Sequence, residues 1–438
     1  MFKCAQNRLK ESYFFIALVL CLAMVLVQDA FAERIFFAGY KGGFYLRSEE
    51  EGGMELKLGG ALQADYRGYN ESQLAGNGFD VRRARLVFRG ALTRWVRFGM
   101  EYEFQGNETD NLVDAYVEGV NGNHALRFGQ FREPFSLEWQ CRDKALYFSE
   151  RSMAWSLSPH RDVGVMLHGQ FFNDGLSYAL GLFNGDGDDG SSRGNEQDSP
   201  EMTGRFVLAP FKNSTLSFIN GFQVGASASY ANIETLNVNL KVKSSGMAAT
   251  SINVYDLSHN TKFGVLQDVD SRVRVGLEVA WSVGPLAMMG ECIQLSYQGL
   301  EPVGQDPKDA DFSAWYGAFL WNITGEAILF NRGIMQPVYP NRNFNPDEQT
   351  WGAFCLGVRV EHFNGDRDWI NTDAHVSTEK ADAFSLALNW VLFPMCRMVF
   401  DVTHTRMSDP IRVRVLSDGQ VDYITRENCF TARCSLDF

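Results

Sequence analysis

The sequence predicts an all-β fold, a transmembrane antiparallel β-barrel of sixteen strands, and three observations lead to it. Many segments alternate apolar and polar residues, the chain begins with an export-type segment, and its last strand-like segment ends on the aromatic Phe438. A period of two predicts strands, and in a membrane barrel such strands present one face to lipid and the other to water.

The first 32 residues predict a cleaved signal peptide. Three basic side chains begin the segment: Lys3, Arg8 and Lys10. An apolar run over 13–27 follows, and Ala30-Phe31-Ala32 supplies a small-residue cleavage site. The alternative, a membrane anchor, is disfavoured because the run is shorter than the roughly 20 apolar residues that span a bilayer. Residues 33–53 then form a short lead-in, and 54–438 form one barrel domain.

Alternation is clearest between Arg272 and Val283, where six apolar residues share one parity and Arg272, Arg274 and Glu278 share the other. Sixteen strands are expected to start near Met54, Val81, Trp95, Leu112, His124, Val163, Leu176, Met202, Phe218, Arg272, Leu286, Phe312, Trp351, Asp382, Cys396 and Asn428. An even number is what a closed bacterial barrel requires. Alternation also describes a soluble β-sandwich, but the two ends of the chain favour a bacterial outer-membrane barrel with short periplasmic turns and long external loops.

Composition narrows the function. No long apolar run follows the signal peptide, which excludes helical membrane spans. The whole chain has a net charge of -13, and the signal peptide contributes +1, which leaves -14 for the mature chain. A surface this acidic makes nucleic acid an unsuitable partner.

Arginines gather early in the mature chain. Six fall within sixteen residues: Arg82, Arg83, Arg85, Arg89, Arg94 and Arg97. If Ala84 and Leu86 face lipid, then Arg83 and Arg85 face the lumen, where guanidinium groups attract anions and bind phosphate or carboxylate in two-pronged fashion. The alternative is that these arginines pair with acids on neighbouring strands and brace the wall.

No catalytic or metal-binding pattern is present, and we expect neither an enzyme nor a cofactor. The chain lacks GxSxG and HExxH motifs and a phosphate-cradling glycine loop. The acidic segment 184–190 (NGDGDDG) fails the calcium-loop pattern because Asp189 stands where glycine is required. Six cysteines remain in the mature chain, and both disulfides and free thiols are open to them.

Several motifs resemble one family in order and spacing: 59–66 (GGALQADY), 82–86 (RRARL), 114–118 (DAYVE), 128–138 (FGQFREPFSLE), 150–152 (ERS) and 181–187 (GLFNGDG). These resemble the successive signatures of the phosphate-selective porin O/P family. The resemblance covers much of the first half of the chain, and the terminal Phe438 fits it.

The resemblance implies a homotrimeric outer-membrane barrel whose constriction passes small anions, phosphate above all. It assigns the paired arginines to Arg82 and Arg83, a further basic position to Arg97, an acidic constriction residue to Asp114, and the lysine of an inward-folded third loop to Lys144. That loop corresponds to 131–161. Arg85 and Arg127 extend the set of pore-lining residues, and Phe438 is the signal that the barrel assembly machinery reads.

The chain departs from the family pattern at two places. Ala61 stands where phosphate-specific members have an arginine, and the basic loop of the outer funnel is reduced to Lys241 and Lys243. The expected function is passive diffusion of small anions, with phosphate favoured. The alternatives are a general diffusion porin and a structural or adhesin barrel.

Overall fold

The computed structural model describes residues 35–40, 43–49, 53–70, 76–105, 111–185, 200–233, 238, 240–257, 266–415 and 420–438. The predicted signal peptide lies outside these residues. Within them the helices are short: α2 (Leu137–Gln140) and the 3-10 turns η1 (Asp143–Ala145), η2 (Met153–Leu157) and η5 (Arg367–Trp369). None of the described helices is long and apolar enough to cross a membrane.

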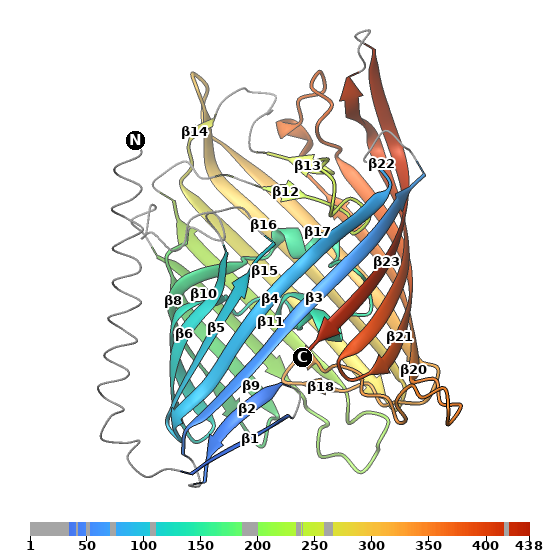
Figure 1. Cartoon of the computed structure of the whole chain (residues 1–438). Coiled ribbons are helices and arrows are strands. Elements are labelled where there is room, and N and C mark those ends of the chain that lie inside the picture. The colour runs from blue at the N-terminus through green and yellow to red at the C-terminus, as the bar shows by residue number, and fades with distance from the viewer. Residues whose placement is uncertain are drawn as a thin grey trace, which may run out of the picture.

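Sixteen antiparallel strands form a closed barrel (Figure 1). They are β3 (Glu55–Tyr69), β4 (Gly78–Thr93), β5 (Val96–Glu103), β6 (Leu112–Asn121), β7 (His124–Arg132), β8 (Arg161–Phe171), β9 (Leu176–Phe183), β10 (Glu201–Leu208), β11 (Gln223–Asn232), β15 (Ser271–Val283), β16 (Leu286–Pro302), β17 (Lys308–Asn322), β20 (Ala353–Asn364), β21 (Lys380–Phe393), β22 (Cys396–Val415) and β23 (Val421–Asp437). Each strand pairs with its neighbours in the chain, and β23 pairs with β3. The predicted strand number and fold class are confirmed.

Seven shorter strands accompany the barrel: β1 (Phe36–Tyr40), β2 (Phe44–Ser48), β12 (Lys241–Val242), β13 (Tyr255–Asp256), β14 (Leu266–Asp268), β18 (Phe330–Asn331) and β19 (Ile334–Met335). β1 and β2 form a hairpin within the expected lead-in, and β2 pairs with the first residues of β3. β23 pairs with β3 from Ala61 onward. The hairpin therefore continues the wall below the C-terminus, as Figure 1 shows.

Alternation decides which face of each strand meets lipid. In β15, Val275, Leu277 and Val279 are exposed on the outside, whereas Arg272 and Arg274 are buried on the inside. Apolar side chains on the outside suit the hydrocarbon core, where an outward arginine would cost about 2–4 kcal/mol at the midplane. The pattern predicted for this strand is confirmed.

Two connections at the short-turn, periplasmic end are long. Residues 209–222 join β10 to β11, and 323–352 join β17 to β20. The simple expectation of short turns at this end is therefore wrong at both places. Gly333 N donates to Gln223 Oε1 at 2.7 Å, and Met335 N donates to Cys141 Sγ at 3.3 Å. These bonds tie the β18–β19 hairpin to the inside of the wall and to the loop that follows β7.

The loop at 133–160, between β7 and β8, folds into the lumen as predicted and is fastened to the opposite wall. Glu361 Oε2 accepts from Met153 N at 2.8 Å, Asp401 Oδ2 accepts from Ser149 N at 2.9 Å, and Arg397 donates to Leu146 O at 2.6 Å. Buried Arg359 adds bonds to Glu138 and Glu361 at 3.0 and 2.9 Å. Because backbone groups of the loop are held by wall side chains, the loop has a fixed position.

One apolar core fills part of the lumen. It joins the loop 133–160, the segment 238–257 and the segment 323–352 to the inner face of β15, β16, β17, β20 and β21. We call this region the filled half. The wall from β3 to β8 is lined by charged side chains instead, and we call it the open half.

Candidate functional site

Two adjoining cavities lie beside the loop 133–160: the inner one faces the open half, and the outer one extends from the open half to Glu201 on β10 and to Arg272 and Arg274 on β15. The inner chamber, of 1010 Å³, lies toward the periplasmic end and reaches Phe438 and the turn at Arg94. The outer chamber, of 600 Å³, lies toward the external end and reaches Lys241 and Lys243. Arg85, Arg132 and Asp143 line both cavities, and we call these three residues the junction.

Basic side chains outnumber acidic ones in each chamber. The inner chamber has ten basic side chains, Arg47, Lys57, Arg85, Arg89, Arg94, Arg97, Arg127, Arg132, Arg142 and Lys144, against the five acids Glu55, Glu101, Asp114, Asp143 and Asp437. The outer chamber has ten, Arg82, Arg83, Arg85, Arg132, Arg151, Arg161, Lys241, Lys243, Arg272 and Arg274, against the five acids Glu103, Glu133, Asp143, Glu150 and Glu201. The interior is thus basic although the whole chain has a net charge of -13.

A β-bulge in β4 turns two consecutive arginines into the lumen. Gln63 pairs with Arg83, but Ala64 pairs with Val81, so Arg82 is the extra residue. A bulge reverses the alternation beyond it. Phe79 and Val81 accordingly face outward on one side of the bulge, and Leu86 faces outward on the other. Simple parity counted from Leu86 would send Arg82 toward lipid, and it fails at the bulge and beyond it, at Val81 and Phe79.

At the junction, three arginines from the wall and the loop surround the carboxylate of Asp143. Asp143 Oδ2 lies 3.4 Å from Arg83 Nε and 3.5 Å from Arg85 Nη1, and Asp143 Oδ1 lies 2.8 Å from Arg151 Nη2. Arg85 also pairs with Glu101 and Glu103, at 2.9 and 2.7 Å. Arg132 donates to the backbone oxygens of Trp139 and Cys141, at 2.6 and 2.9 Å, and Arg151 shares the second of these acceptors at 3.0 Å.

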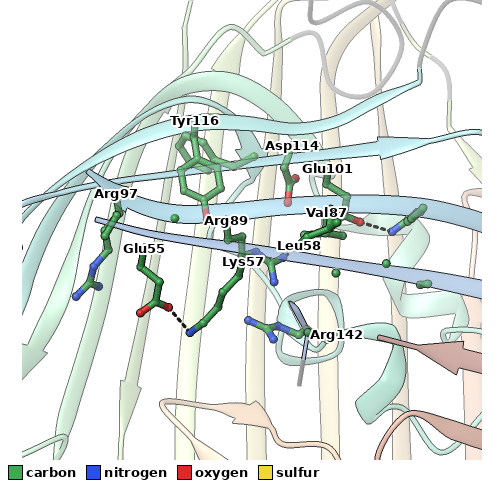
Figure 2. Close-up of a pocket in the computed structure, with 18 of the residues that line it drawn as sticks. Glu55, Lys57, Leu58, Val87, Arg89, Arg97, Glu101, Asp114, Tyr116 and Arg142 are labelled. Carbon is green, nitrogen blue, oxygen red and sulfur yellow. Dashed lines mark hydrogen bonds and ion pairs between the residues drawn. The ribbon is translucent and has the colours of Figure 1, made fainter. Parts of the chain in front are cut away.

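In the inner chamber, basic groups come from both sides (Figure 2). Arg89 and Arg97 project from β4 and β5, and Arg142 faces them from the loop. Asp114 accepts from Arg161 Nε at 2.8 Å. Arg127 donates to Glu118 at 2.7 Å and stacks over Tyr116, with 4.1 Å from its Cζ to the ring centroid.

The outer chamber has a similar mixture of paired and surplus cations. Arg82 Nε donates to Glu150 Oε1 at 2.8 Å, and the same oxygen accepts from Arg67 and Arg433 at 2.6 and 2.7 Å. On the far wall Glu201 pairs with both Arg272 and Arg274, at 2.5 and 2.7 Å. One carboxylate is therefore shared among two or three guanidinium groups in each case.

The two departures from the family pattern fall inside the chambers. Ala61 lines the inner chamber and lies directly opposite Arg85 in the register of β3 and β4. An arginine is therefore present at this level of the wall, on the neighbouring strand. Lys241 and Lys243 line the outer chamber, and Lys243 Nζ donates to Thr250 O at 2.5 Å.

Burial and neighbouring charges act against each other on the loop. Burial acts to raise the pKa of Asp143, but Arg83, Arg151 and Arg85 outweigh it and hold that pKa well below its usual range. The same opposition holds the pKa of Glu150 low, with Arg82, Arg433 and Arg67 as its cations. Burial lowers the pKa of Lys144. The carboxylates of Asp143 and Glu150 are therefore ionised at neutral pH.

All seven residues predicted from the sequence line one or both chambers: Arg82, Arg83, Arg85, Arg97, Asp114, Arg127 and Lys144. Five of them, Arg82, Arg83, Arg85, Asp114 and Arg127, also form ion pairs, so bracing and lining are not exclusive roles. Sequence reasoning missed further charged groups, namely Arg142, Asp143 and Arg151 in the loop and Arg132 and Arg161 on the adjoining ends of β7 and β8. Alternation does not determine where loop side chains point. The one signal was the high density of charged residues between 132 and 161.

Other candidates add nothing to the site. The six cysteines among the described residues are free, with Cys141, Cys355 and Cys429 buried. Among the described residues, no group of three His, Cys, Asp or Glu side chains could hold a metal ion. Most of the acidic segment 184–190 lies outside the described residues.

Solved structures with a similar fold share little sequence identity with this chain. An anion-selective porin from Comamonas acidovorans has a TM-score of 0.53 at 10% identity, over 88% of this chain and 100% of that chain. OmpT of Vibrio cholerae has a TM-score of 0.51 at 9% identity, over 89% and 99%. Its in-vitro folded trimer form has a TM-score of 0.52 at 9% identity, over 88% and 100%. At this identity the likeness shows the fold alone.

Comparison with curated proteins finds no match. The family model described as "Phosphate-selective porin O and P" matches residues 56–423, which is most of the chain and all but the ends of the barrel. The match includes both strands of the bulge and the whole inward loop, and family and fold together indicate the outer membrane. The chain belongs to the phosphate-selective porin O and P family.

Proposed function

We propose that this protein is an outer-membrane porin for the passive diffusion of small anions, with phosphate favoured. The observation that carries the proposal is the junction, where two basic chambers adjoin and two arginines face one acidic side chain. Basic side chains that line a narrow lumen replace part of the hydration shell of an anion and repel cations from solution. No covalent chemistry is needed.

Phosphate is favoured because guanidinium groups match its geometry. The planar guanidinium donates two parallel hydrogen bonds to an oxyanion, and a chloride ion cannot accept both in that way. Arg83, Arg85 and Arg132 lie around the junction, and Lys144 faces the inner chamber. The family name supports the same substrate. A general anion porin would use the same arginines without this preference.

The remaining parts of the proposal concern export and assembly. We infer cleavage of the signal peptide after Ala32, assembly through recognition of Phe438, and a homotrimer in outer-membrane lipid. The trimer form of OmpT, a porin of similar fold, supports the oligomeric state. Mass spectrometry of the mature chain and cross-linking in detergent test the first and last of these.

Conductance in planar bilayers tests the function. We expect reversal potentials that favour anions, and block of the chloride current by phosphate. Arg83→Glu and Lys144→Glu should each abolish or reverse the anion preference. Lys212→Glu is the matched control, because Lys212 pairs with Asp174 in a periplasmic connection outside both chambers. A preference for cations would refute the proposal, and the absence of conductance would favour a structural barrel.

A further inference from the structure

Asp143 is the one acidic side chain that lines both chambers among the described residues. It begins η1 on the inward loop, and its carboxylate extends into a group of arginines that come from the wall and from the loop itself. An anion that passes from one chamber to the other meets these same arginines. Asp143 therefore occupies the place where the arginines would hold a passing anion.

The surrounding arginines depend on Asp143 for their neutralisation. Among the ion pairs of the described residues, Asp143 is the sole acidic partner of Arg83 and of Arg151, at 3.4 and 2.8 Å. Arg132 bonds to two backbone oxygens. If Asp143 were neutral, the guanidinium groups of Arg83 and Arg151 would lose the partner of these ion pairs. Buried charges without a partner are costly, so an anion from solution would bind there strongly.

The position of Asp143 is fixed by its backbone as well as by its side chain. Arg397 Nη2 donates to Asp143 O at 2.6 Å, and Leu146 N donates to the same oxygen at 3.2 Å. Arg397 stands on β22, in the wall that faces the open half. These bonds hold the backbone of Asp143 beside the arginines, so its carboxylate competes with every anion that enters the junction.

We propose that Asp143 is a built-in counter-anion, whose carboxylate occupies the arginine cluster at the junction and is displaced in part by each permeating oxyanion. The inference rests on the proposed function and adds to it the residue that sets binding strength. Conduction needs a site attractive enough to enter and weak enough to leave. A carboxylate that already satisfies the arginines weakens each binding event, and it favours anions with several oxygens over chloride.

The test compares phosphate block of the chloride current in the wild type and in Asp143→Asn, with inorganic phosphate as the probe. The phosphate concentration that halves the chloride current should fall by about tenfold or more in Asp143→Asn, because no carboxylate then competes with phosphate for the arginines. Asp143→Ser should behave in the same way and serves if the first variant does not fold. Asp143→Glu keeps the charge and should stay close to the wild type.

The matched control is Asp174→Asn, because Asp174 also pairs with a lysine and an arginine but lies outside both chambers. It should leave the block unchanged. The inference is overturned if phosphate blocks Asp143→Asn and Asp143→Ser at the wild-type concentration. It is also overturned if the half-blocking concentration falls about tenfold in Asp143→Glu. Failure of the proposed function looks different, because the wild type itself would then show no anion preference.

Discussion

The wall from β3 to β8 and the wall from β15 to β21 enclose one lumen and face it with opposite chemistry. In the open half, arginines on β4 lie opposite glutamates on β5, and basic side chains remain in excess over acidic ones. In the filled half, β16 and β17 direct Ile293, Leu295 and Phe312 inward, where loops from both ends cover them. The apolar core closes most of one half, so the passage follows the open half and, in the outer chamber, the charged side chains of β10 and β15, where charge decides what enters.

The comparison also explains why the inward loop has two unlike faces. One face supplies Phe135, Met153 and Leu157 to the apolar core. The other supplies Arg142, Asp143 and Lys144 to the chambers. The rigidity of the filled half therefore holds the charged groups of the open half at fixed distances.

The largest expected effect comes from Arg359→Met in the filled half. Arg359 is almost fully buried and holds Glu138 and Glu361, so its loss leaves two carboxylates buried without their cation. The free energy of unfolding should fall by about 3–5 kcal/mol, measured by urea denaturation of the detergent-folded barrel. Arg332→Met is the control, because that exposed arginine pairs with Asp174 at 3.4 Å and should contribute less than about 1 kcal/mol. Equal losses would contradict the role of burial, because Arg359 is buried beneath the inward loop and Arg332 is exposed.

A smaller effect is expected from pH at Lys144 in the open half. Burial lowers the pKa of Lys144, so its positive charge is present at neutral pH and is lost as the pH rises, before that of an ordinary lysine at about 10.4. Anion preference, measured by reversal potentials, should therefore decline in the alkaline range. Lys144→Arg should remove this decline because arginine stays protonated. Exposed Lys57 gives the control: Lys57→Arg should leave the pH profile unchanged.

The smallest effect is expected from Arg97→Gln. Arg97 is exposed in the inner chamber, away from the junction. Stability should change by less than about 0.5 kcal/mol. Anion preference should fall slightly at about 0.1 M salt and be unchanged at about 1 M, where the screening length is only about 3 Å. A loss as large as that of Arg83→Glu would place the selective step in the inner chamber rather than at the junction.

Much of the barrel could be predicted because alternation against lipid is a local signal. All sixteen strands were expected, and fourteen of the starts lie within four residues of the observed ones. The two exceptions have physical causes. Phe218 is an exposed apolar residue in the long connection 209–222. The apolar residues of this connection placed the predicted start before the observed start of β11 at Gln223. The first residues of β23 include Asp422, Thr425 and Arg426, whose polarity hid the strand until Asn428.

The filled half and the loop charges could not be predicted in this way. The inward parity of β16 and β17 is as apolar as the outward one, and this was a readable sign that something covers them from inside. Arg82 required knowledge of a bulge, which alternation cannot supply. Asp143 lies in a loop, where only tertiary contacts determine what a side chain meets.

The seam between β3 and β23 has a consequence for the order of folding. Gly60 and Phe438 exchange backbone hydrogen bonds of 2.8 and 3.0 Å, and Gly60 has no room for a side chain beside the Phe438 ring. Arg433 meets Asp65 across the same seam, at 2.7 Å and 368 positions away in the chain. Contacts this remote form late, because the whole chain must be ordered before their ends meet. Asp65 and Arg433 can therefore pair only when β3 and β23 have met, and their ion pair stabilises the closed barrel rather than lining the pore.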